Sequence, residues 1–266
     1  MPDATLLSAV ERIARDAGEA IMGVYARGFS VTEKADHSPL TEADLAAHRV
    51  IAAGLAALPE VIPVLSEEDA ESFAGPDSQA RYWLVDPLDG TKEFIKRNDE
   101  FTVNIALIER GRPVLGVVVV PVTGVAYVAA RELGAHKVHA DGKRVVIGVA
   151  GRPISGATWR VMGSRSHPSA ELAGWLETLG VHEVTPVGSS LKTCLIAEGR
   201  ADVYPRLGPT SLWDTGAAQA VLEQAGGRVV DRYGQPLGYA DPAHTLNPHF
   251  VAWGCQAPVP PCFQAG

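Results

Sequence analysis

The chain has 266 residues, a net charge of −8 and 46% hydrophobic residues, a composition typical of a soluble globular protein. Its aliphatic stretches, such as 117–120, fall far short of the roughly 20 apolar residues of a membrane-spanning helix, so no integral membrane segment is expected. The acidic balance, with no basic stripe, argues against a polymeric nucleic acid as a partner.

The cysteines and the N-terminus indicate the expected compartment. Cys194, Cys255 and Cys262 are odd in number and widely spaced, which favours a reducing environment over a disulfide framework. Residues 1–4 lack the basic start of a signal peptide, and no apolar core follows them. We therefore expect a cytoplasmic protein.

The first part of the chain begins with two predicted helices. Apolar residues recur every three or four positions across 4–27, which predicts an amphipathic helix. A second helix is expected to follow Thr41 as its N-cap, to bury Leu45 and to end before Pro59. Extended segments are then predicted at 61–65, 82–85, 101–109, 114–121 and 125–130, with tight turns at 111–113 and 141–142.

Strands and helices alternate in the second part of the chain. The pattern predicts strands at 160–163, 183–187 and 201–204, and helices opened by Pro168, running through Leu195 and spanning 214–225. It indicates an α/β half packed against an α+β half, with the boundary near 151–156. Residues 1–155 would form a metal-binding half and residues 156–266 a substrate-recognition half, whose tail 254–266 receives no function.

Acidic residues stand at the ends of predicted elements rather than on helix faces. In the segment WLVDPLDGT an apolar strand is expected to end at Asp86, Pro87 to stop its hydrogen-bond ladder, and Gly90 to permit a sharp bend. Asp86 and Asp89 around that bend can converge on hard cations, and the Leu88 carbonyl offers a further oxygen ligand. Mg²⁺ is the metal that such oxygen ligands favour.

Two more acidic positions follow the same logic. Glu67 comes directly after the predicted strand 61–65, and Asp214 opens a helix, where backbone N–H groups face outward. Each position also has a simpler interpretation: Asp214 as a helix cap, and the segment 67–69 as a solvated loop. Together they need a cation, because a like-charged pair 4 Å apart costs about 4 kcal/mol at an effective dielectric constant of 20.

Divalent cations would invert the local charge and make phosphate a good ligand, which points to phosphate ester hydrolysis. Thr91 could hydrogen-bond the attacking water, with Asp44 accepting from the Thr91 hydroxyl. A capping box of Thr41 and Asp44 is the simpler interpretation of the latter residue. The turn at Gly90 would open a short helix whose amides receive phosphate oxygens.

These motifs resemble a known family. LSEED at 65–69, DPLDGT at 86–91 and WD at 213–214 are similar to the signature of the lithium-sensitive, magnesium-dependent phosphatase superfamily that includes inositol monophosphatase. Within it, the chain resembles the bacterial 3′(2′),5′-bisphosphate nucleotidases from about residue 6 to residue 250. The segments that carry this closer resemblance are KAD at 34–36, SP at 38–39, YWLVDPLDGTKEFIKRN at 82–98, FTVNIALI at 101–108, GSSLK at 188–192, YPR at 204–206 and PT at 209–210.

The resemblance implies a layered αβαβα sandwich with the active site between its two halves. It implies two or three Mg²⁺ ions, inhibition by Li⁺, and hydrolysis of adenosine 3′,5′-bisphosphate to AMP and phosphate. The sulfated analogue, 3′-phosphoadenylyl sulfate, is a second implied substrate, and the implied role is clearance of a by-product of sulfate assimilation. A peripheral association with the cytoplasmic side of the inner membrane stays open, although no basic amphipathic helix argues for it.

The resemblance also assigns residues. The metal ligands would be Glu67, Asp86, the Leu88 carbonyl, Asp89 and Asp214, and the catalytic residues would be Asp44, Thr91 and Glu67. The substrate-binding residues would be Gly90, Thr91, Ser164, His167, Ser189, Lys192, Arg206 and Asp214, with Arg165 beside them. Solvated Lys192 and Arg206 side chains, and a helix-capping or surface His167, are the simpler interpretations.

Two other functions compete with the nucleotidase. An inositol monophosphatase would share the metal ligands but would not need Lys192 or Arg206. A metal-dependent regulatory protein that has lost its chemistry would bind Mg²⁺ without releasing phosphate. The sequence makes no prediction of oligomeric state.

Overall fold

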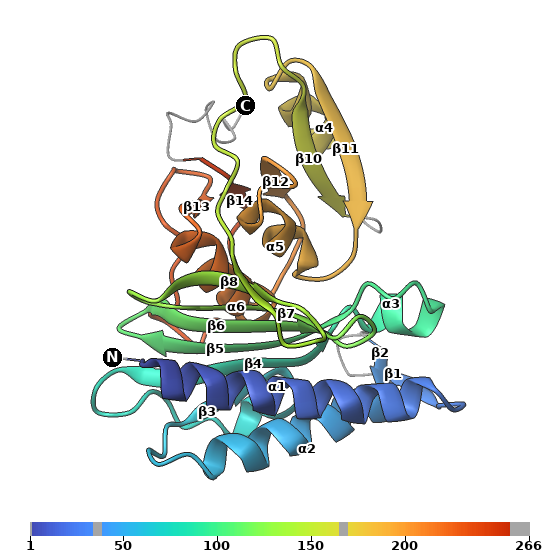
Figure 1. Ribbon diagram of the computed structural model, residues 1–266, viewed down its shortest axis with the longest axis vertical. Coiled ribbons are helices and arrows are strands. Elements are labelled where there is room, and N and C mark those ends of the chain that lie inside the picture. Colours follow the sequence, from blue (N-terminus) through green and yellow to red (C-terminus); the bar gives the residue numbers. More distant parts are fainter. Residues whose placement is uncertain (1, 34–38, 165–169, 256–266) are drawn as a thin grey trace.

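The computed structural model describes residues 2–33, 39–164 and 170–255, which form alternating layers of helices and sheets (Figure 1). Helices α1 and α2 cover one face of a seven-stranded sheet, and α5 and α6 lie between that sheet and a five-stranded sheet. Helix α4 packs on the outer face of the five-stranded sheet, where Trp175 contacts Trp253. The predicted αβαβα sandwich is confirmed.

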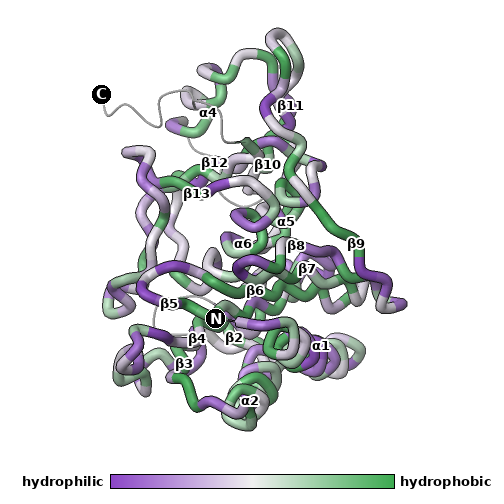
Figure 2. Tube along the Cα trace, turned by 60° about the vertical axis from the view of Figure 1, so that its left-hand side comes forward, coloured by the Kyte–Doolittle hydropathy of each residue, from purple (hydrophilic) through white to green (hydrophobic). Residues whose placement is uncertain are grey.

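The first layer consists of α1 (Ala4–Tyr25) and α2 (Glu42–Ala56). Helix α1 alternates between hydrophobic and hydrophilic positions along its length, as Figure 2 shows, and its apolar side buries against the sheet. The prediction for Leu45 is wrong, because this side chain is 39% exposed. In the first half of α2, the small residues Ala43 and Ala47 occupy core-facing positions instead.

The seven-stranded sheet has the strand order β3-β4-β5-β6-β7-β8-β9, with β3 and β4 parallel and the other neighbours antiparallel. Helices cover both faces, which explains why its central strands carry continuous apolar runs rather than an alternating pattern. The strands span Val64–Ser66, Arg81–Asp89, Thr102–Glu109, Arg112–Val120, Val125–Ala130, Gly134–Val138 and Arg144–Val146.

Two local predictions about this sheet need correction. The β5–β6 turn consists of Arg110 and Gly111, both with positive φ, whereas Pro113 lies within β6. Pro87 does not end the ladder of β4 either, because pairing resumes at Asp89 after an irregularity that begins at Asp86. This bulge gives β4 one residue more than its partner β5 over the same stretch, and it reorients the side chains at the strand end.

The five-stranded sheet has the order β11-β10-β12-β14-β13. Its elements and the helices between them are β10 (Trp159–Ser164), α4 (Ala170–Glu177), β11 (His182–Val187), α5 (Leu191–Ala197), β12 (Val203–Arg206), α6 (Leu212–Gln224), β13 (Arg228–Asp231) and β14 (Phe250–Trp253). The predicted strands and helices are present, and Pro168 lies outside the described residues. The short strands β8, β9, β13 and β14 were not predicted, and neither was the small β1–β2 ribbon (Val31–Glu33, Pro39–Thr41).

Helix α6 packs between the two sheets and contacts both. Its Gly216 faces Leu84 of β4, and its Val221 belongs to the same buried cluster as Tyr204 of the five-stranded sheet. This packing places the N-terminus of α6 beside the end of β4. The predicted boundary between halves at 151–156 falls in the segment that connects the two sheets and stays a prediction.

Candidate metal centre and adjoining pocket

Three carboxylates meet at the end of β4. Asp86, Asp89 and Asp214 each offer one oxygen such that these oxygens lie within 4.8 Å of one another. In a regular strand, residues three positions apart point to opposite faces, so Asp86 and Asp89 could not converge. The bulge in β4 supplies the extra residue that allows them to share one side.

Asp214 reaches the same point from the other direction. It stands in the first turn of α6, where its Oδ2 accepts a hydrogen bond of 2.8 Å from the backbone N–H of Ser211. The capping interpretation and the metal-ligand interpretation are therefore compatible, because the cap fixes the carboxylate that faces the other two.

Electrostatic repulsion is pronounced in this cluster. Burial raises the pKa of Asp86 well above its ordinary value, and the neighbouring charge of Glu67 is the next cause. Burial also raises the pKa of Asp214 to about 8, with Asp89 the largest charge contribution. The pKa of Asp89 is raised by burial as well, and the Lys192 ammonium opposes this shift. Ionised together, these groups repel, and a cation would offset that cost.

Glu67 lies next to this cluster. It opens the short 3₁₀ helix η1 (Glu67–Ser72) directly after β3, whose residue Ser66 pairs with Val85 of β4. Its charge acts on all three aspartates. The group of carboxylate oxygens within 4.8 Å of one another nevertheless comprises Asp86, Asp89 and Asp214, and Glu67 as a metal ligand stays a prediction.

The cluster fits a hard divalent cation. Its members are carboxylates, and the Leu88 carbonyl lies at the same bend, 3.3 Å from the Thr91 hydroxyl. Oxygen-only ligand sets favour Mg²⁺ over softer metals, which prefer imidazole or thiolate. Glu67, Asp86, Asp89, Asp214 and the Leu88 carbonyl could therefore hold a metal.

Thr91 and Asp44 form the predicted pair. The Thr91 hydroxyl donates to Asp44 Oδ1 at 3.1 Å. Asp44 is 1% exposed, and its Oδ2 accepts from both the backbone N–H and the hydroxyl of Thr41, at 2.7 and 2.6 Å. Burial raises the pKa of Asp44, and these hydrogen bonds oppose the shift. Asp44 therefore caps α2 and contacts Thr91 at once.

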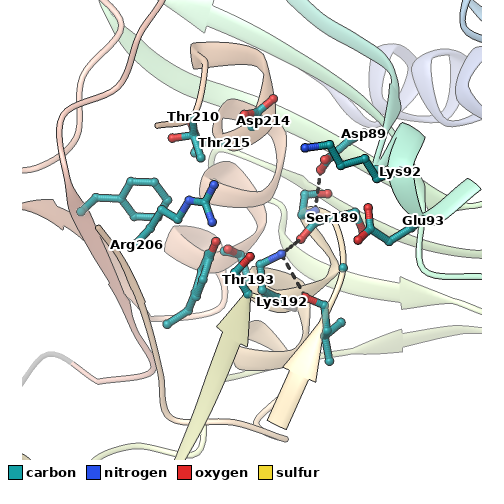
Figure 3. Close-up of a pocket in the computed structure, with 17 residues that line it drawn as sticks. Asp89, Lys92, Glu93, Ser189, Lys192, Thr193, Arg206, Thr210, Asp214 and Thr215 are labelled. Carbon is teal, nitrogen blue, oxygen red and sulfur yellow. Dashed lines mark hydrogen bonds between the residues drawn. The ribbon is translucent and has the colours of Figure 1, made fainter. Parts of the chain in front are cut away.

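A pocket adjoins the carboxylates (Figure 3). Asp89 and Asp214 line it together with predicted substrate residues from both parts of the chain: Gly90, Ser164, Ser189, Lys192 and Arg206. Gly90 has a φ of 95° and precedes the short helix α3 (Thr91–Lys96), so the expected bend and helix are present. His167 and Arg165 lie outside the described residues.

Lys192 and Arg206 are buried cationic residues of the pocket wall, at 7% and 8% exposure. The Lys192 ammonium donates to the carbonyls of Ser189 and Val187, at 2.6 and 3.3 Å, and lies 5.2 Å from the Tyr204 ring centroid. Burial lowers the pKa of Lys192 to about 8. The solvated interpretation of these side chains is therefore wrong.

Arg206 retains hydrogen-bonding capacity. Its Nη2 donates to the Pro209 carbonyl at 2.9 Å, whereas its buried Nε has no hydrogen-bond partner among the described residues. A buried, unpartnered donor of a charged group is costly.

Several lining residues were missed by sequence reasoning. Lys92 and Glu93 directly follow Thr91, and Thr210 and Thr215 flank Asp214, so sequence proximity to the motifs was the available signal. Figure 3 places Lys92 beside Asp89, and Thr210 and Thr215 near Asp214.

Comparison with known proteins agrees with this architecture. The model of the inositol monophosphatase family matches residues 3–253. The chain therefore belongs to the inositol monophosphatase family. Within the described ranges, no helix combines the length and apolarity that spanning a membrane requires.

Individual proteins of known name or structure are similar to this chain over most of its length. The 3′(2′),5′-bisphosphate nucleotidase CysQ of Escherichia coli K12 is 51% identical over 247 residues, which cover 92% of this chain and 98% of that protein. The crystal structure of CysQ from Bacteroides thetaiotaomicron is 39% identical with a TM-score of 0.78, over 94% of this chain and 97% of that one. An inositol monophosphatase from Anabaena sp. PCC 7120 is 25% identical with a TM-score of 0.73, over 94% and 91% of the two chains.

Proposed function

We propose that this protein is a magnesium-dependent phosphomonoesterase that converts adenosine 3′,5′-bisphosphate to AMP and phosphate. The observation that carries the proposal is a carboxylate cluster sharing one pocket with two buried cationic side chains, Lys192 and Arg206. The names of its 51% identical relatives support the same activity. We extend the proposal to 3′-phosphoadenylyl sulfate and to clearance of a by-product of sulfate assimilation.

The residues that would hold two or three Mg²⁺ ions are Glu67, Asp86, Asp89, Asp214 and the Leu88 carbonyl. When bound, the metal would lower the pKa of water and neutralise charge on the phosphate and the leaving oxygen. Asp214 would also contact the substrate from the N-terminal turn of α6. We expect Li⁺ to inhibit the enzyme, as the family resemblance implies.

Thr91 and Asp44 would position the nucleophile. Because the Thr91 hydroxyl donates its proton to Asp44 Oδ1, the Thr91 oxygen keeps lone pairs that can accept a hydrogen bond from the attacking water. The water oxygen forms a bond to phosphorus while the bond from phosphorus to the ribose 3′ oxygen breaks. That oxygen then takes up a proton, which yields AMP and phosphate.

The second phosphate needs recognition without cleavage. We assign the 5′-phosphate to Lys192 and Arg206, whose burial strengthens charge-assisted hydrogen bonds. The hydroxyls of Ser164 and Ser189 and the backbone at Gly90 and Thr91 would complete the contacts to the substrate. We retain His167 as a proposed contact to the base.

A direct test measures phosphate release in Mg²⁺ buffer and in EDTA. The substrates are adenosine 3′,5′-bisphosphate, its sulfated analogue, inositol 1-phosphate and fructose 1,6-bisphosphate. We expect the highest kcat/KM for adenosine 3′,5′-bisphosphate and loss of activity in EDTA. Higher kcat/KM for inositol 1-phosphate would identify an inositol monophosphatase. Mg²⁺ binding without phosphate release from any substrate would identify a non-catalytic regulatory protein.

A further inference from the structure

Hydrogen bonds reach the Asp89 carboxylate from two separate elements. The backbone N–H of Ser190, at the start of α5, donates to Asp89 Oδ2 at 2.5 Å. The side-chain amide of Asn104, in β5, donates to the same oxygen at 3.2 Å. One proposed metal ligand is therefore held by hydrogen bonds from β5 and from the start of α5.

The side chains of Ser190 and Asn104 close this arrangement into a ring. The Ser190 hydroxyl donates to Asn104 Oδ1 at 2.8 Å, and the Thr102 hydroxyl lies 2.9 Å from the Ser190 hydroxyl. Because Asn104 uses its amide for Asp89, its oxygen must accept from Ser190, and Ser190 must accept from Thr102. All three side chains are at most 5% exposed, so water does not substitute for these bonds.

The same loop carries the nucleotide side of the pocket. Ser189 has a φ of 50°, a left-handed conformation that costs a serine of order 1 kcal/mol and persists where its surroundings fix it. Those surroundings are visible on both sides of Ser189: Gly188 donates its N–H to Glu100 at 2.8 Å, and the Lys192 ammonium donates to the Ser189 carbonyl at 2.6 Å. The loop 188–190 thus connects Asp89 to Lys192.

We infer that Ser190 and Asn104 are positioning residues that couple metal binding at Asp89 to nucleotide binding at Lys192, an inference that rests on the proposed function. A cation on Asp89 fixes its carboxylate, the ring fixes the loop, and the loop fixes Lys192. A nucleotide that binds the metal-loaded protein then loses less conformational freedom. By linkage, the nucleotide tightens metal binding by the same factor.

AMP is the probe that separates this coupling from direct metal contact. It carries only the 5′-phosphate, which the proposed function assigns to Lys192 and Arg206 and not to the metal. Isothermal titration calorimetry would measure the Kd of AMP with and without Mg²⁺, and the Kd of Mg²⁺ with and without AMP. We expect Mg²⁺ to tighten AMP binding to the unchanged protein by about tenfold, within the usual range of coupling between sites.

The ring variants are Ser190→Ala, which removes only a hydroxyl, and Asn104→Ala, which removes the side-chain contact to Asp89. In each variant, we expect the Kd of AMP measured without Mg²⁺ to lie within about twofold of the Kd measured with Mg²⁺. A general loss of stability would weaken both Kd values and leave their ratio unchanged. Thr178→Ala, which removes a hydroxyl bonded at 2.6 Å to the Trp175 carbonyl, serves as the remote control and should keep the tenfold ratio.

The outcomes separate the inference from the proposed function. Suppose that the unchanged protein binds AMP and Mg²⁺, and that Mg²⁺ tightens AMP binding to Ser190→Ala and Asn104→Ala by the same factor as in the unchanged protein. The inference is then wrong and the proposed function stands. An AMP Kd that does not change with Mg²⁺ in the unchanged protein would likewise overturn the inference and leave the proposed function standing. If the unchanged protein fails to bind AMP in Mg²⁺ buffer, both are overturned. Ser190→Ala loses one hydroxyl without changing the backbone, so it keeps the test available even if Asn104→Ala does not fold.

Discussion

The Thr91 hydroxyl and the Asp44 carboxylate lie 3.1 Å apart although 47 positions separate them in the chain. Asp44 is oriented from its own helix, because Thr41 donates two hydrogen bonds to its other oxygen. The geometry of the N-terminus of α2 thereby sets the position of a group proposed to act in catalysis.

Removal of the Thr91 hydroxyl should affect the chemical step and spare metal binding. We expect Thr91→Val to lower kcat by about 10²- to 10⁴-fold, the usual contribution of a group that handles a proton. Thr91→Ser keeps the hydroxyl and should retain most activity. Steady-state kinetics and Mg²⁺ titration of both variants check this, and a kcat above a tenth of normal in Thr91→Val would contradict the assignment.

The aspartate cluster predicts an unusual pH dependence of stability without metal. The pKa values of Asp86, Asp89 and Asp214 are raised above 3.8, that of Asp214 to about 8, so the folded protein binds more protons than the unfolded chain between these limits. Their contribution to stability is complete below the unfolded pKa and is lost as pH rises through the folded pKa.

In EDTA, the Tm should therefore increase as pH falls from 8 to 7. This window lies above most of the ordinary titration range of histidine. Lys192, whose pKa is lowered to about 8, acts in the opposite sense, and it does so mainly above pH 8. Mg²⁺ should raise the Tm most at pH 8, because it binds the deprotonated carboxylates. Thermal scans at fixed ionic strength measure this, and a Tm in EDTA that falls between pH 8 and pH 7 is the contrary result.

Asp214→Asn tests the charge repulsion in the aspartate cluster, because it removes one carboxylate charge and keeps a side chain of similar shape. The amide oxygen can still accept from the Ser211 N–H, while one repelling charge is removed. In EDTA at pH 8 we expect the variant to melt at a higher temperature than the unchanged protein, and to gain little from added Mg²⁺. Activity should be lost. A normal Tm increase on Mg²⁺ addition would show that Asp214 is not a ligand.

Local signals in the sequence were enough for the helix starts and for the acidic positions. Thr41 and Asp44 carry their capping pattern within four residues, and acids at strand ends are recognisable without knowledge of the partner strand. The exposed Leu45 shows the limit of such signals, because small alanines can take the core-facing positions of a helix while a leucine lies outside.

The sequence predicts that Asp86 and Asp89 converge, but it does not reveal the backbone feature that brings them together. Pro87 was expected to end β4, but the strand continues after a bulge, and only the register with Thr102 and Asn104 reveals that Asp86 and Asp89 share a side. Asn104 is a polar residue in the apolar run FTVNIALI, and that exception was a signal of its buried contact with Asp89.

Lys192 should determine substrate preference. Loss of its charge-assisted hydrogen bonds is worth about 1.5–3 kcal/mol, so Lys192→Met should raise KM for adenosine 3′,5′-bisphosphate by at least tenfold. The pKa of about 8 predicts that, in the unchanged protein, this KM rises as pH increases through 8, because the neutral amine binds phosphate less well.

Lys143→Met is the control for that measurement, because Lys143 is exposed in the turn between β8 and β9. Its KM should match that of the unchanged protein. An equal KM increase for inositol 1-phosphate in Lys192→Met would instead indicate a general effect on the pocket, and would remove the argument for nucleotide selectivity.

Two glycine substitutions test how closely α6 must approach the sheet to deliver Asp214. A Cβ on Gly116 of β6 would clash with the Ala217 carbonyl and lie 2.7 Å from the Ala220 Cβ, so α6 would have to move. Overpacking of this kind costs about 1–3 kcal/mol, and the clash lies one turn from Asp214. We expect Gly116→Ala to lower both the Tm and the affinity for Mg²⁺. Gly23 lies at an exposed position of α1, and no atom of another described residue, beyond its neighbours in the helix, comes within 4 Å of a Cβ added there. Gly23→Ala should therefore raise stability by about 0.5–1 kcal/mol and leave Mg²⁺ affinity unchanged. If Gly116→Ala binds Mg²⁺ as tightly as Gly23→Ala, the metal site does not depend on the close approach of α6 to β6.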